Sequence, residues 1–237
     1  MSDGESPHRV GIGSPSPEER PTLDAVVARS GIPPSKFLPL FRRELASVPD
    51  PERALNNFLR FVSTGFTSSL LSGFLGDPRS LSVALTLFGH SQYLADILVR
   101  NPELFHWLMS PNVRAGSPGR DELLREARLA VAPFERIEKK MDALKRFQRR
   151  EILRISARDI LEEAEVTAVT AELSRLADAI VETVAAVAFE DLNTRLSANI
   201  TPVFSVIGLG KLGGEELNFS SDIDLMFVYD EDGDLDF

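Results

Sequence analysis

Apolar residues recur three and four positions apart through most of the chain, which is the spacing of one face of an α-helix. Between Pro34 and Trp107 the pattern restarts several times, and one such face consists of Ala54, Leu55, Phe58, Phe61 and Val62. Asp77-Pro78 is typical of a helix start, because aspartate caps the first turn and proline fits within it. We therefore expect a stack of short helices whose phenylalanines form a core.

Two longer helical segments follow a linker rich in Gly, Pro and Ser, which we place at Asn112–Gly119. The first extends from Asp121 to Leu161. The second, Glu165–Leu196, repeats its apolar residues at helical spacing over about 30 positions, which corresponds to about 45 Å of helix. We interpret it as a member of a helical bundle, with dimerisation through a coiled coil as the alternative.

The pattern changes near residue 200. The apolar run Val203–Ile207 is typical of a buried strand and leads into a glycine-rich turn, Gly208–Gly214. We expect a brief helical segment at Glu215–Phe219, followed by a second strand that opens with Asp222-Ile223-Asp224.

These patterns predict a mostly α protein in which an N-terminal helical bundle precedes the start of an α/β domain. The expected parts are a disordered tail (1–20), an N-terminal helical region (21–112), a long-helix region with a basic helix (120–200) and the beginning of the α/β domain (201–237).

Composition narrows the class of protein. The chain has 237 residues, of which 43% are hydrophobic, so it can bury a sizeable core. It has no cysteine, which excludes disulfides and thiolate metal ligands. No apolar stretch of about 18 residues and no signal-like N-terminus stands in the sequence, so we expect a cytoplasmic protein that does not enter the membrane.

Charge is unevenly distributed along the chain. The net charge is -10, and nine acidic residues with no Lys or Arg follow from Glu215 onward. Removing these nine leaves 27 acidic against 26 basic residues, so the rest is nearly neutral. An acidic cluster around paired aspartates is typical of a site for hard cations. We interpret Glu231–Asp236, beyond the second strand, as a solvated loop.

A basic segment, Lys139–Arg158, carries arginines every four residues at 146, 150, 154 and 158, which places them on one side of a helix. One interpretation is a side that faces phosphate or an acidic partner. The other is a solvated face with Leu144, Phe147, Ile152 and Ile155 packed inward. The general weakness of charge runs as functional signals favours the second.

The last segment contains the residues best suited to chemistry. Residues two apart in a strand point to the same side, so Asp222 and Asp224 would present two carboxylates together. Such a pair can hold one or two Mg²⁺ ions, usually with a third carboxylate from a neighbouring strand. The glycines allow close approach of phosphate, and Lys211 could pair with it. A Walker-type phosphate loop does not fit, because Leu212 follows the lysine where Ser or Thr is required.

The run from Gly208 to Leu225 reads GLGKLGGEELNFSSDIDL. It closely resembles the motif of the bifunctional glutamine synthetase adenylyltransferase/adenylyl-removing enzymes, a family of polymerase-beta-like nucleotidyltransferases. Leu144–Leu161 and Gly89–Phe105 also resemble this family. The resemblance implies that Asp222 and Asp224 are the catalytic, metal-binding pair. It implies phosphate contacts for Gly213, Gly214 and Ser221, while a phosphate role for Lys211 is our inference.

The family carries two catalytic domains, and this sequence resembles the first, adenylyl-removing one. That domain releases AMP from a tyrosine of glutamine synthetase by phosphorolysis, giving ADP, and the second attaches AMP from ATP. The resemblance implies Mg²⁺, ATP or ADP and phosphate as ligands, and glutamine synthetase and the PII signalling protein as partners. No nucleic acid is expected as a partner.

We also expect the chain to be truncated and inactive alone, since two strands do not complete a nucleotidyltransferase sheet. Two alternatives stay open at this point. The chain could be another metal-dependent nucleotidyltransferase, acting on a small molecule or a different protein. It could instead be a non-catalytic interaction module with a vestigial metal site.

Overall fold

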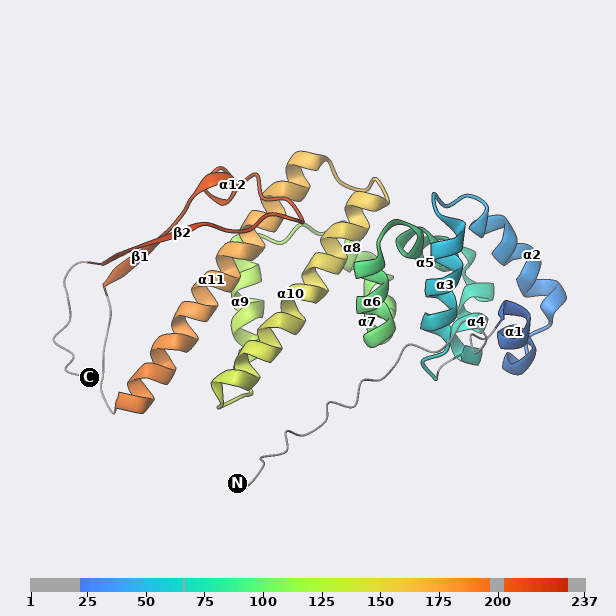
Figure 1. Cartoon of the computed structure of the whole chain (residues 1–237), viewed down its shortest axis with the longest axis horizontal. Helices are drawn as coiled ribbons and strands as arrows, with labels where there is room; N and C mark the ends of the chain where they lie inside the picture. The colour runs from blue at the N-terminus through green and yellow to red at the C-terminus, as the bar shows by residue number, and fades with distance from the viewer. Residues whose placement is uncertain (1–21, 66, 197–202, 230–237) are drawn as a thin grey trace, which may run out of the picture.

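The computed structural model describes residues 22–65, 67–196 and 203–229, and these are mostly α-helical (Figure 1). The helices are α1 (Leu23–Ser30), α2 (Pro34–Leu45), α3 (Pro51–Val62), α4 (Thr67–Gly76), α5 (Pro78–His90), α6 (Gln92–Arg100), α7 (Glu103–Leu108), α8 (Pro111–Ala115), α9 (Arg120–Val131), α10 (Ile137–Ile160), α11 (Val166–Leu196) and α12 (Gly210–Gly213). The strands are β1 (Phe204–Gly208) and β2 (Leu225–Tyr229). The predicted tail at 1–20 and the acidic loop at 231–236 lie outside the described residues.

Short helices α1 to α7 form one end of the molecule, as the pattern of apolar residues predicts (Figure 1). The Asp77 side chain accepts a hydrogen bond from the Arg79 amide and so caps α5, which confirms that helix start. The core of this end is a chain of aromatic rings with neighbouring centroids 4.7–5.9 Å apart, formed by Phe37, Phe41, Phe58, Phe74, Phe105, Phe61 and Phe88.

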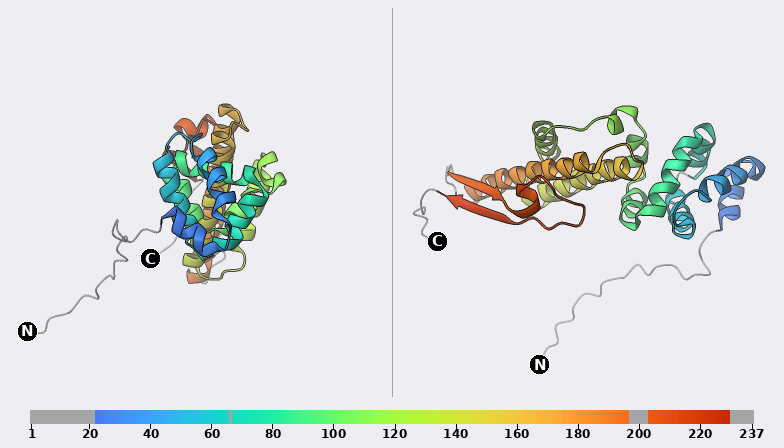
Figure 2. Two further views of the ribbon diagram at one scale, coloured as in Figure 1. Left: turned by 90° about the vertical axis from the view of Figure 1, so that its right-hand side faces the viewer. Right: turned by 90° about the horizontal axis from the view of Figure 1, so that it is seen from above.

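The helices α9, α10 and α11 pack against one another beside this end (Figures 1 and 2). Their apolar faces meet in a second hydrophobic cluster, which includes Leu123, Phe147, Ile155, Leu173 and Leu176. The interpretation of the longest helix as a bundle member is therefore confirmed. Helix α10 also contacts α5 and α6, so it joins this group of helices to the short helices α1 to α7.

Two predicted boundaries are wrong. The linker expected at Asn112–Gly119 contains helix α8, which starts at Pro111 because proline suits the first helical turn. The helix expected from Asp121 to Leu161 is two helices, separated at residues 132–136. Pro133 lies in this break, and proline cannot continue a helix without losing a backbone hydrogen bond.

The interpretation of the basic helix as a solvated face is confirmed for part of its length, because Leu144, Phe147 and Ile155 pack inward while Arg146 is exposed. It is wrong for the last two arginines.

Arg154 and Arg158 are neither solvated nor available to an outside partner, because they are buried against Glu172 of α11. Each arginine has a nitrogen 2.5 Å from a Glu172 carboxylate oxygen. Glu151, one turn before Arg154, accepts a further hydrogen bond of 2.8 Å from it. The ionic cluster Glu151–Arg154–Arg158–Glu172 thus joins α10 to α11 inside the bundle.

Burial alone would lower the pKa of Arg154, because it removes water from the guanidinium charge. The charges of Glu151 and Glu172 and their hydrogen bonds outweigh this and raise the pKa above its ordinary value. Arg154 therefore keeps its positive charge inside the bundle. The stability of the cluster depends on every charge keeping its partner, since an unpaired charge inside a protein is costly.

The two strands form an antiparallel hairpin that lies alongside α11 (Figure 1). Phe204 pairs with Tyr229 and Gly208 with Leu225. Phe204 also packs against Phe189 of α11, with ring centroids 5.0 Å apart. In the part of the chain that the structure describes, no helix combines the length and apolar character needed to cross a membrane.

We predict that Glu172→Ala destabilises the fold by about 3–5 kcal/mol, because it leaves two arginines buried without their shared carboxylate. Chemical denaturation followed by circular dichroism measures this loss. The control is Glu122→Ala, which removes an exposed carboxylate 3.9 Å from Arg125 and should cost less than about 0.5 kcal/mol. Equal losses in the two variants would contradict a structural role for the cluster.

Candidate metal and nucleotide site

The site motif occupies the connecting end of the hairpin, where β1 leads into α12 and an irregular loop leads back to β2 (Figure 1). The short helix is at Gly210–Gly213, within the predicted turn, and the helix expected at Glu215–Phe219 is absent. Glu215 has a φ of 56°, a left-handed conformation that interrupts a helix. Leu217 then turns inward and is 7% exposed.

Asp222 and Asp224 precede β2 instead of opening it, because the ladder ends where Leu209 turns away into α12. One backbone contact continues past that point: the Leu209 amide donates to the Asp224 carbonyl at 2.9 Å. Both aspartates are exposed. The structure therefore brings Asp224 beside the start of the glycine-rich segment, and Asp222 lies two residues before Asp224.

Gly210 lies against Asp224. It has a φ of 56°, and a Cβ added to it would stand 3.9 Å from Asp224 Oδ2. Because Gly210 has no side chain, the backbone leaves space next to this carboxylate in which a ligand could bind. This glycine was not among the predicted ligand contacts, although its place in the motif could have indicated it.

The two glycines predicted to contact phosphate differ in their surroundings. A Cβ on Gly213 would stand 2.5 Å from the Gly208 carbonyl oxygen, which is closer than real contacts allow. A Cβ on Gly214 would stand 3.7 Å from its nearest neighbour, an ordinary contact. Gly213 is therefore required for packing α12 onto β1, whatever it does for a ligand.

Ser221 belongs to a tight turn with Asn218. Its hydroxyl lies 2.7 Å from Asn218 Oδ1, and the Asn218 amide donates back to that hydroxyl at 3.3 Å. The Ser220 amide also donates to Asn218 Oδ1, at 3.1 Å. These contacts fix the backbone just before Asp222. Asn218, which the sequence reasoning gave no role, organises the turn.

Within the described residues, Asp222, Asp224 and Lys211 take part in no ion pair at 4.0 Å or less. Lys211 is exposed on α12. The same part of the chain contains no group of three or more Asp, Glu or His side chains placed to share a metal ion. The third carboxylate stays a prediction.

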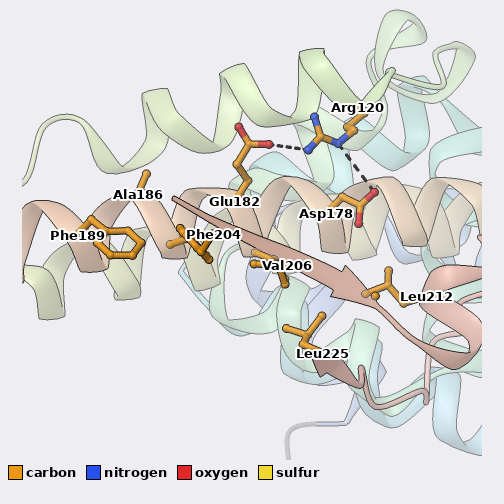
Figure 3. Close-up of a pocket in the computed structure, with 12 residues that line it drawn as sticks. Arg120, Asp178, Glu182, Ala186, Phe189, Phe204, Val206, Leu212 and Leu225 are labelled. Atoms are coloured by element: carbon orange, nitrogen blue, oxygen red, sulfur yellow. Dashed lines mark hydrogen bonds and ion pairs between the residues drawn. The ribbon is translucent and has the colours of Figure 1, made fainter. Parts of the chain in front are cut away.

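A pocket of about 400 Å³ lies between the hairpin and α11 (Figure 3). Its apolar lining includes Phe204, Val206, Leu212 and Leu225, and neither site aspartate reaches it.

Arg120 provides the polar wall of this pocket, with Nη2 2.6 Å from Glu182 and Nε 3.9 Å from Asp178 (Figure 3). Burial raises the pKa of the Asp178 carboxyl; Arg120 opposes the shift, while Glu215 and Glu182 add to it.

A family model for glutamate-ammonia ligase adenylyltransferase matches residues 81–236, which include most of α5, all of α6 to α12 and the whole hairpin. The chain belongs to this family. The match covers the site motif together with the helices that carry it, which confirms the resemblance drawn from Gly208–Leu225, Leu144–Leu161 and Gly89–Phe105.

Curated relatives agree with the family model. The bifunctional glutamine synthetase adenylyltransferase/adenylyl-removing enzyme of Thioalkalivibrio sulfidiphilus is 30% identical over 210 residues, covering 84% of this chain and 22% of the relative. The enzymes of the same name from Chromobacterium violaceum and Ralstonia nicotianae are 36% identical over 157 residues and 33% over 213. They are matched over 65% and 86% of this chain and 17% and 22% of their own lengths. The chain thus spans about a fifth of the relatives it matches.

We predict that Gly213→Ala opens the site end of the hairpin, whereas Gly214→Ala does not. Lys211 is the sole Lys or Arg after Arg195, so tryptic cleavage there reports local opening. Mass spectrometry should detect the peptide that begins at Leu212 earlier in the Gly213→Ala digest. Equal cleavage in both variants would show that the close approach of Gly213 to Gly208 is not needed.

Proposed function

We propose that residues 204–229 bind a nucleotide with Mg²⁺ and serve in nucleotidyl transfer on glutamine synthetase. The observation that carries this proposal is the placement of Asp222 and Asp224. Both are exposed, take part in no ion pair of the described residues and lie inside the segment that matches the family. Asp224 also lies beside Gly210, which has no side chain to crowd it.

The donor set suits a hard cation. Carboxylate oxygens are the ligands that Mg²⁺ prefers, and Asp222 and Asp224 would supply them. When bound, the ion would neutralise phosphate charge and favour displacement at phosphorus. Lys211 would pair with a phosphate oxygen, and the exposed glycines of α12 would let phosphate approach the backbone.

The finer proposal is that this site removes AMP from glutamine synthetase. A phosphate oxygen would attack the phosphorus of the adenylyl-tyrosine ester, the bond from phosphorus to the tyrosine oxygen would break, and a proton would return to that oxygen. The products are ADP and glutamine synthetase with its tyrosine hydroxyl restored. The resemblance of the Glu216–Asp224 segment to the first catalytic domain supports this direction over attachment of AMP from ATP.

The remaining expectations follow from the same resemblance. We propose a cytoplasmic protein whose partner is glutamine synthetase, with the PII protein acting through regions of the relatives beyond the matched fifth. We also propose that a third carboxylate from outside the described residues completes the site.

We predict that Asp222→Asn and Asp224→Asn each weaken binding of ADP with Mg²⁺ by more than about tenfold, because each removes an anionic oxygen donor. Isothermal titration calorimetry with and without Mg²⁺ measures this. The control is Glu216→Gln, which removes the same charge from the same exposed loop and should bind as the wild type does. An equal loss in all three variants would indicate general charge instead of ligation.

We further predict that the 237-residue chain alone does not release ADP from adenylylated glutamine synthetase in the presence of phosphate. Its two carboxylates would bind the nucleotide without completing the catalytic site. Steady turnover would contradict the need for a third carboxylate. Binding to glutamine synthetase with no nucleotide binding at all would favour the interaction module over an enzyme.

A further inference from the structure

One buried hydroxyl connects the helical bundle to the loop of the site. Ser174 of α11 is 1% exposed, and its Oγ lies 2.9 Å from the Thr170 carbonyl and 3.2 Å from the Leu217 amide nitrogen. A serine within a helix commonly donates to the carbonyl four residues earlier. That donation leaves the lone pairs of Ser174 free to accept from Leu217, which is 43 residues further along the chain.

Leu217 lies in the irregular part of the loop, where no helix or strand satisfies its amide. A buried amide without an acceptor is costly, so the loop gains free energy by placing Leu217 at Ser174. The Leu217 side chain is buried in the same cluster as Leu173 and Leu176. Apolar packing alone would let Leu217 slide along α11. The directional hydrogen bond to Ser174 therefore fixes where the Leu217 backbone lies.

The contacts continue from Leu217 to the carboxylates. Asn218 follows Leu217, and its side chain and amide form the turn with Ser220 and Ser221. Asp222 is the next residue. Holding Leu217 in place therefore holds the start of the Asn218–Ser221 turn. That turn determines the position of Asp222.

We propose that Ser174 is a positioning residue for the site. It touches no ligand and acts by holding the Leu217 amide, and through it the Asn218–Ser221 turn, so that Asp222 and Asp224 face the same space. This inference rests on the proposed function, because the site it positions is the proposed one for nucleotide and Mg²⁺.

Ser174→Ala tests the proposal, and α11 offers a matched control. Thr183 is also 1% exposed and donates to the Ala179 carbonyl at 2.7 Å, and no loop amide of the described residues donates to it. Thr183→Val removes that hydroxyl at equal size. Ser174→Thr keeps the hydroxyl at the first site and should restore function if the hydroxyl is what matters.

The measurements are ADP affinity with Mg²⁺ by calorimetry, amide exchange at Leu217 by NMR, and the unfolding midpoint, all on the 237-residue chain. We expect Ser174→Ala to weaken binding about tenfold and to speed Leu217 exchange, at a midpoint similar to that of Thr183→Val. Ser174→Thr should bind as the wild type does.

The outcomes separate the two proposals. Absence of binding in the wild type overturns the proposed function, and Leu217 exchange then decides the positioning role. Exchange at Leu217 that is unchanged by Ser174→Ala overturns that role. The positioning role is also overturned if Ser174→Ala binds ADP as tightly as the wild type does. It is overturned as well if Thr183→Val loses as much ADP affinity as Ser174→Ala.

Discussion

Burial of two leucines of the site motif against α11 joins the hairpin to the helical bundle. Leu212 and Leu217 are 6% and 7% exposed, while most other apolar residues of the hairpin and loop remain open to solvent. They belong to the same cluster as Leu173, Leu176 and Val187 of α11. Since an isolated two-stranded hairpin is marginally stable, this contact and the Phe189–Phe204 pair hold the site in place.

The sequence was informative wherever one local signal decides the structure. Helical spacing located the short helices and α11, the Asp77 cap marked the start of α5, and the family motif located the hairpin. It was misleading where tertiary contacts decide. A brief helix was expected at Glu215–Phe219, between the glycine-rich turn and the second strand, but its left-handed first residue and the inward turn of Leu217 exclude a helix.

The basic helix shows the same limit for charge. The four-residue spacing of Arg154 and Arg158 places both on one side of α10, but the neighbouring sequence does not indicate which residues pack against that side. The partner is Glu172, which belongs to another helix. Likewise, the sequence grouped Gly213 with Gly214 as phosphate contacts, whereas only the structure shows that Gly213 has a backbone oxygen where a side chain would go.

One short stretch of α11 combines both kinds of contact. Glu172 and Ser174 are two residues apart, so they project from nearly opposite sides of the helix. Glu172 faces the arginines of α10, and Ser174 faces the Leu217 amide of the site loop. The ionic cluster therefore fixes the rotation and height of α11 at the level where the loop is attached. An ionic cluster that is separate from the candidate site thus helps to position the part of α11 against which the site loop packs.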